Sequence, residues 1–210
     1  MNFEERTSAN VLRIPELERQ KISSVLRLFQ EADTEVQEFQ NASGLKCLPG
    51  CGRCCESPES ESTVLEMLPA AAQYFARNGS GFSEDTIEAL PAKGVCQFYR
   101  PDPIVAGHGR CANYEFRPSM CRLFGFSARM NKHNQPELMT CAQIRGTTPA
   151  ECERAQEQLS QGTPAPQMQD YSMKFLNIDP VLAAEKLPIN LAFRRALERI
   201  AFLSEMGSER

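Results

Sequence analysis

The chain has 210 residues and a net charge of −4, with 41% hydrophobic and 24% charged residues. A chain of this length and composition can bury a hydrophobic core, so we expect one folded domain over 1–210 and exclude wholesale disorder. The acidic balance argues against binding to nucleic-acid backbones, and no apolar run in the sequence reaches the length of a membrane span. The first residues lack the basic start and apolar stretch of a signal peptide, which predicts a cytoplasmic protein.

Helical patterns occupy both ends of the chain. Hydrophobic residues from Ile22 to Phe39 recur at spacings of three and four, which predicts a helix over 15–42 with one buried face. Fewer than three heptads fit this pattern, so packing within the domain is favoured over a coiled-coil dimer arm. A C-terminal helix is predicted over 181–206, and Pro188 can begin its amphipathic part.

A third helix is predicted after the first cysteines. Thr63 and Glu66 have the spacing of a capping box, which predicts a helix from there to about Arg77. Pro69 is expected to kink this helix or to split it after its first turn, because proline removes a backbone donor.

The centre of the chain predicts few regular elements. Two short aromatic segments within 95–115 flank a Pro/Gly loop and predict a small β-hairpin. One helical turn is expected at 117–126, irregular structure over 126–148 and a helix over 149–161. The predicted fold class is therefore mainly α, with terminal helices packed around an irregular cysteine-rich metal-binding centre and a small β-hairpin.

Nine cysteines are the unusual feature of the composition, and all of them lie between Cys47 and Cys152. They are too sparse for a disulfide scaffold, and without an export signal they should stay reduced. Clustered thiols in a reducing compartment usually bind a metal or take part in catalysis.

The strongest motif is Cys47-x3-Cys51-x2-Cys54-Cys55. Such spacing lets one loop place several thiolates around a centre, and soft thiolates select zinc or iron–sulfur clusters over hard cations. Adjacent side chains point in different directions, so Cys54 and Cys55 either serve two centres or act as one ligand and one supporting group.

The remaining ligands must come from elsewhere in the chain. Four further cysteines are candidates: Cys96, Cys111, Cys121 and Cys141. Together with the four cysteines of the first motif they make eight thiols, enough for two four-thiolate sites. Cys152 lies in an ordinary helical segment and is expected to be a spectator. His108 could replace one thiolate, although a polar loop role is the simpler interpretation, and His133 is a weaker candidate.

Arginines accompany the cysteines. Arg117 and Arg122 flank Cys121, and their guanidinium groups could donate to a sulfur or neutralise an anionic centre. The alternative interpretation is that they are surface charges.

These segments resemble the bacterial zinc- or iron-chelating cysteine-cluster family, also called YkgJ-type. CLPGCGRCC resembles its first motif, and CANYEFRPSMCRLF, from Cys111 to Phe124, resembles its second, although Tyr114 is displaced by one position from the commonest spacing. The resemblance covers 47–145 and implies a metal-binding core there. Related flagellin lysine N-methylases imply an iron–sulfur centre linked to methyl transfer.

Several functions remain open from the sequence. An iron–sulfur cluster is favoured over zinc, in a metal-binding rather than catalytic protein. The enzyme hypothesis, redox or methyl transfer, has few candidate acid–base groups in the loops: Asp102, His108, Tyr114 and His133. A metal chaperone or sensor is the third hypothesis. Cys47-x3-Cys51-x2-Cys54 also matches the spacing of radical S-adenosylmethionine enzymes, but no strand–helix alternation follows it.

Overall fold

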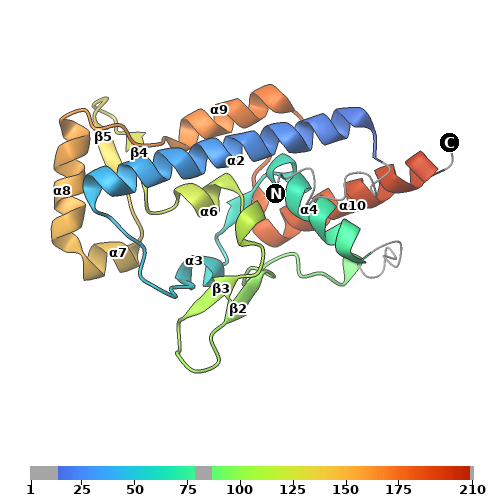
Figure 1. The fold of residues 1–210 in the computed structure, drawn as a ribbon, viewed down its shortest axis with the longest axis horizontal. Coiled ribbons are helices and arrows are strands. Elements are labelled where there is room, and N and C mark those ends of the chain that lie inside the picture. Colours follow the sequence, from blue (N-terminus) through green and yellow to red (C-terminus); the bar gives the residue numbers. More distant parts are fainter. Residues whose placement is uncertain (1–13, 79–86, 209–210) are drawn as a thin grey trace.

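The structure is a computed structural model that describes residues 14–78 and 87–208 (Figure 1). It is mainly helical, as predicted. Its helical segments are α2 (Glu16–Ser43), α3 (Arg53–Glu56), α4 (Val64–Asn78), the 3-10 turn η2 (Tyr114–Phe116), α6 (Ser119–Leu123), α7 (Ala142–Thr147), α8 (Pro149–Ser160), α9 (Met168–Ile178) and α10 (Ile189–Ser208).

The strands of the described residues form small antiparallel pairs. They are β1 (Glu61–Ser62) with β6 (Leu187–Pro188), β2 (Tyr99–Pro101) with β3 (Gly109–Cys111), and β4 (Ser127–Met130) with β5 (Pro136–Met139). The parallel strand–helix repeat of radical S-adenosylmethionine enzymes is not found among the described residues. The same part of the chain contains no helix with the length and apolarity that a bilayer crossing requires.

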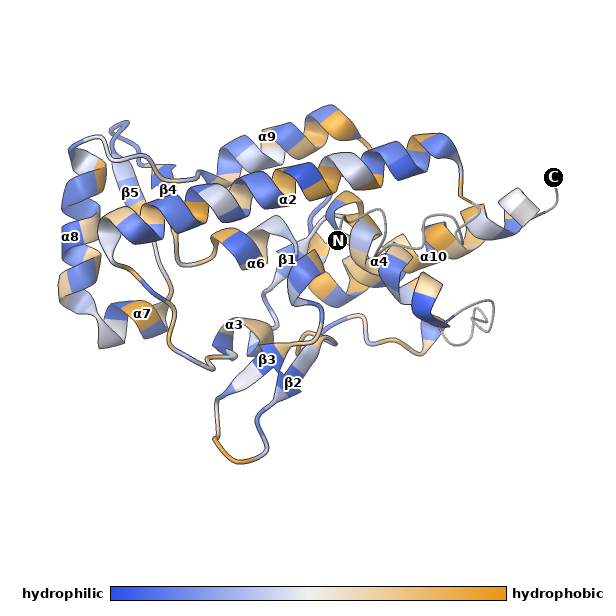
Figure 2. Cartoon of the chain, in the orientation of Figure 1, coloured by the Kyte–Doolittle hydropathy of each residue, from blue (hydrophilic) through white to orange (hydrophobic). Residues whose placement is uncertain are grey.

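The long helix α2 is the axis on which the other elements pack (Figure 1). Pro15 precedes its first turn, and Gly44 ends it with φ +76°, where its N–H donates to Gln40 O at 2.9 Å. The hydrophobic face predicted from Ile22 to Phe39 is buried, with Val25 and Phe29 at most 1% exposed. This face meets α4, α6, α8 and α9, so the helix packs within its own chain. The sequence pattern favoured this arrangement over a coiled-coil dimer arm. Figure 2 shows the matching alternation of hydrophilic and hydrophobic residues along α2.

Helix α4 begins with the predicted capping box. Thr63 Oγ1 accepts from Glu66 N at 3.2 Å, and the Glu66 carboxylate accepts from Thr63 Oγ1 at 3.0 Å. Pro69 lies inside a continuous helix, so the predicted alternative of a split is wrong. The helix packs lengthwise against α10, where Tyr74 meets Phe193 edge to face with ring centroids 5.5 Å apart.

The C-terminal helix begins at Ile189, later than the predicted residue 181. Asp179 provides the physical reason, because its Oδ1 accepts from the amides of Val181 and Leu182, each at 2.9 Å. These bonds hold residues 180–184 in turns, which compete with a helix.

The predicted β-hairpin exists but is displaced toward its loop. The main chain of residues 95–97 bonds to Cys55 and Asn190, so the paired strands are Tyr99–Pro101 and Gly109–Cys111. The predicted helical turn is α6 and the helix predicted over 149–161 is α8. The stretch predicted to be irregular, 126–148, instead contains the β4–β5 hairpin and α7, and α9 was missed.

Candidate metal centre

The first cysteine motif is hydrogen-bonded to the β2–β3 hairpin. Gly109 N donates to Gly50 O at 2.9 Å, and Cys51 forms an isolated antiparallel bridge with His108. Cys54 and Cys55 lie in α3, a single helical turn within the motif. Cys96 N donates to Cys55 O at 3.0 Å, so main-chain bonds bring two distant cysteine segments together.

The ring of Tyr99 fills the space between the two glycines of these segments. A Cβ placed at Gly52 would lie 2.7 Å from the Tyr99 Oη, and one placed at Gly109 would lie 2.6 Å from it. The Tyr99 hydroxyl donates to His108 O at 3.0 Å and lies 3.2 Å from Glu56 Oε1. Tyr99 therefore acts as a strut between α3 and the hairpin, and the glycines leave room for it.

Helix α6 places Cys121 beside these segments. Pro118 precedes the helix, and the buried carboxylate of Glu66 accepts from Ser119 N at 2.8 Å and from the Ser119 hydroxyl. One carboxylate thus caps the N-termini of both α4 and α6, and it ties the helix that carries Cys121 to the helical core.

Arg122 ties α6, the helix that carries Cys121, to α2. It is 4% exposed, and its guanidinium donates to Arg117 O at 2.8 Å, to Glu115 O at 2.5 Å and to the Asp33 carboxylate of α2. Its guanidinium carbon also lies 4.4 Å from the centre of the Phe29 ring. Its donors therefore orient the 115–122 segment rather than point at a sulfur.

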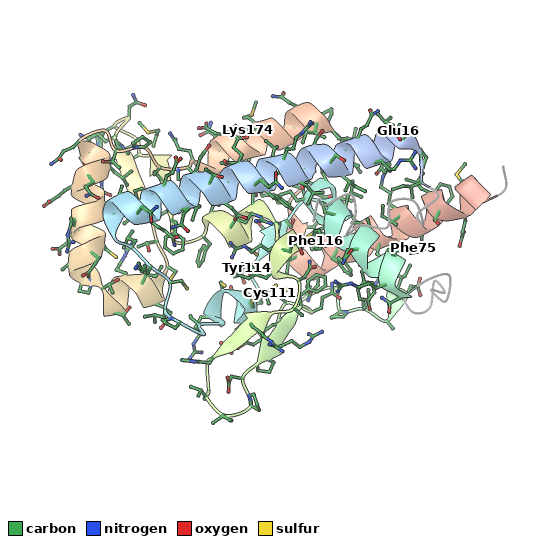
Figure 3. All side chains as sticks on the ribbon, viewed as in Figure 1. Glu16, Phe75, Cys111, Tyr114, Phe116 and Lys174 are labelled. Carbon is green, nitrogen blue, oxygen red and sulfur yellow. The ribbon has the colours of Figure 1, made fainter. Side chains whose placement is uncertain are left out.

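Five of the predicted ligands lie within electrostatic reach of one another. Cys54 interacts with the thiols of Cys96, Cys111 and Cys121 as well as with its neighbour Cys55. They come from α3, the 95–98 segment, the end of β3 and α6. Figure 3 shows Cys111 at the end of β3, with Tyr114 and Phe116 following it toward α6.

The thiols of this group titrate differently. The Cys55 thiol hydrogen-bonds to Cys54 and, despite burial, lowers the pKa of Cys54 to about 6, helped by nearby backbone N–H groups and Arg117. The same bond, with burial and the neighbouring thiols, raises the pKa of Cys55. Burial raises the pKa of Cys96, Cys111 and Cys121. Within the Cys54–Cys55 pair, the hydrogen bond therefore favours the thiolate form of Cys54.

Arg117 is the cation that this group faces. Its charge lowers the pKa of Cys54, and it favours the charged forms of Cys111 and Cys121 too. The guanidinium carbon lies 3.9 Å from the centre of the Tyr114 ring, and Nη2 lies 3.4 Å from Asp33 Oδ1. Its Nε is buried and has no hydrogen-bond partner.

The other three predicted ligands form a neighbouring group. The pKa of Cys47 is raised by loss of water around its sulfur and by Cys51, Cys141 and Cys54. Cys141 precedes α7, and its sulfur accepts from Ile144 N at 3.4 Å. Cys152 is buried in α8, 9% exposed, and interacts with Cys141.

The polar loop residues singled out from the sequence have identifiable contacts. The Asp102 carboxylate accepts from the amides of Ile104 and Val105 in the hairpin loop, and Tyr114 stacks under Arg117. His108 lies beside Gly50, and His133 lies in the β4–β5 turn, where its N–H donates to Asn131.

The donor set fits a soft metal centre in its chemistry. Five sulfurs with a cation beside them match the thiolate donors that zinc and iron–sulfur clusters take. In the described parts of the chain, no three His, Cys, Asp or Glu side chains already surround one position at metal-binding distance. The structure therefore brings the thiols near one another, while the described residues contain no assembled metal site.

Sequence reasoning missed three residues that organise this region. Asp33 pairs with both arginines from 84 and 89 residues away, Tyr99 forms the strut, and Asn190 bonds to the segment around Cys96 from α10. No local pattern marks Asp33 or Asn190. The glycines on either side of the cysteines were a signal for a close approach such as that of Tyr99.

Comparison with known families agrees with this geometry. No curated protein and no solved structure matches the chain. Residues 46–153, just over half of the chain, match the family model CxxCxxCC, described as "Putative zinc- or iron-chelating domain". This region contains all nine cysteines and both arginines beside Cys121. The chain belongs to the CxxCxxCC family of zinc- or iron-chelating domains.

Proposed function

We propose that the protein holds an iron–sulfur cluster through cysteine thiolates, with zinc as the alternative metal. The proposed ligands are drawn from the group of five: Cys54, Cys55, Cys96, Cys111 and Cys121. The observation that carries the proposal is their gathering from four chain segments, with the charge of Arg117 acting on Cys54, Cys111 and Cys121. Thiolates so close repel one another, and a bound metal centre offsets that repulsion.

The proposal assigns distinct tasks to the two arginines. Arg117 neutralises part of the negative charge of a thiolate-bound centre and offers its unpartnered Nε to a sulfur. Arg122 keeps the segment carrying Cys121 against α2 through Asp33. Cys47, Cys51 and Cys141 are proposed as a second set of donors, adjacent to the first through Cys54.

A second candidate function is metal delivery or sensing. The observation that favours it is that, among the nine cysteines, the residues Cys47 and Cys54 are exposed. An enzymatic role would need an open position on the metal and acid–base groups beside it. Asp102 and Tyr114 are instead engaged in loop and arginine contacts.

The test is elemental analysis of protein purified without oxygen. We expect iron and acid-labile sulfide in comparable amounts, with the broad visible absorption of an iron–sulfur cluster. Stoichiometric zinc in a colourless protein would support the alternative metal. Absence of both metals from anaerobically purified protein would refute the metal-binding proposal.

A further inference from the structure

The first turn of α10 lies outside the family match, yet it contacts the segment around Cys96. Asn190 is 1% exposed. Its Oδ1 accepts from Gln97 N at 2.9 Å, and its Nδ2 donates to Val95 O at 3.0 Å. One buried side-chain amide therefore bonds to the main chain on both sides of Cys96.

The residue before it bonds to the other cysteine segment. Ile189 N donates to Ser60 O at 2.8 Å, and the Ser60 hydroxyl donates to Cys54 O at 3.0 Å. Cys96 N in turn donates to Cys55 O at 3.0 Å. These bonds form a closed ring that runs from α10 through Ser60, α3 and Cys96 back to α10.

An amide is suited to this place because it combines one donor and one acceptor on a short side chain. Aspartate keeps the acceptor and loses the donor, whereas alanine loses both and leaves two main-chain groups without their partner. Apolar packing strengthens the same contact, since Phe98 meets Phe193 of α10 edge to face with ring centroids 4.8 Å apart.

We propose that Asn190 is a positioning residue that holds Cys96 in place, and that the first turn of α10 belongs to the frame of the metal centre. The part concerning the metal rests on the proposed function, but the part concerning the Cys96 thiol does not. By linkage, a metal bound through Cys96 also stabilises the contact of residues 95–97 with Asn190, and loss of that contact weakens metal retention equally.

The experiment compares Asn190→Ala with Leu197→Ala. Leu197 is fully buried further along α10, so its truncation lowers the unfolding free energy without removing a bond to residues 95–97. Two properties are measured on metal-free protein: alkylation of Cys96, followed by mass spectrometry, and hydrogen exchange of the peptide containing residues 95–98. A third, metal loss to a chelator, is measured on protein as purified.

We expect Asn190→Ala to accelerate Cys96 alkylation and local exchange by about tenfold, because buried main-chain groups lose their partners. Leu197→Ala should change these rates less than Asn190→Ala although it unfolds more easily. Equal acceleration by Leu197→Ala, or none by Asn190→Ala, would overturn the assignment.

The two proposals fail in distinguishable ways. If the wild type contains no metal while Asn190→Ala still exposes Cys96, the proposed function is wrong and the positioning role stands. If the wild type binds metal and Asn190→Ala retains it as well as Leu197→Ala does, Asn190 does not position a ligand.

Discussion

Gly52→Ala tests how the cysteine loop is built. The new Cβ would lie 2.7 Å from Oη and 2.8 Å from Cζ of Tyr99, so either the ring or the loop between Cys51 and Cys54 must move. Tyr99 is 8% exposed and cannot turn away without losing its contacts with Glu56 and His108 O. Overpacking of this kind costs about 1–3 kcal/mol, and loss of a hydrogen bond adds about 1 kcal/mol.

The expected loss is therefore about 2–4 kcal/mol of unfolding free energy, or roughly 4–16 °C in Tm for a chain of this size. Thermal and urea unfolding of metal-free protein measure it. Gly146→Ala is the control, because nothing lies within 4 Å of a Cβ at that helical position. This control should be neutral or slightly stabilising, since alanine favours a helix.

A double-mutant cycle identifies the cause. If the clash with the Tyr99 ring is responsible, Gly52→Ala should cost little in a Tyr99→Ala background, and the two single effects should not add. Additive losses, or an unchanged Tm in Gly52→Ala, would refute the strut between α3 and the hairpin.

Three further predictions concern charge and ligation. Arg117→Lys should release metal to a chelator faster than wild type, because lysine lacks the planar guanidinium group and its stacking on Tyr114. The control Arg195→Lys, on the exposed surface of α10, should release metal at the wild-type rate. Cys121→Ser should lower the metal content and increase protease cleavage within 92–148, because metal binding and folding of this region are coupled. Metal-free protein as resistant to protease as metal-bound protein would contradict this coupling. Burial raises the pKa of Asp179, but Lys21 and two amides lower it overall. The carboxylate therefore stabilises the fold above about pH 4, and this stabilisation is lost as the pH falls further. In urea unfolding, the free energies of Asp179→Asn and wild type should converge at low pH.

The helical frame could be predicted because its signals are local. The stripe of α2 and the capping box of Thr63 and Glu66 depend on residues three or four apart, and the structure confirms both. The β4–β5 hairpin was missed because strands of four residues offer too few positions to show a period. Helix α9 carried a signal, since Tyr171 and Phe175 are four apart and both buried, but the preceding Gly/Pro stretch masked it.

The candidate site likewise combines a local motif, visible in the sequence, with long-range contacts that are not. The cysteine spacing predicted a set of donors, which stays a prediction, and the CxxCxxCC match covers the same segment. What holds those donors is long-range: Asp33 reaches Arg122 across 89 residues, and Asn190 reaches Gln97 across 93. A single sequence contains no local pattern for such pairs, because the partners meet only after the helices pack.

The most direct test of the metal centre compares two buried thiols, Cys96 and Cys152, which are 6% and 9% exposed. Each is replaced by serine, and the iron, zinc and sulfide contents are measured after anaerobic purification. The account predicts that Cys96→Ser loses most of its metal, whereas Cys152→Ser keeps the wild-type amount. Equal metal contents in the two variants would contradict the assignment of the centre to the group of five cysteines.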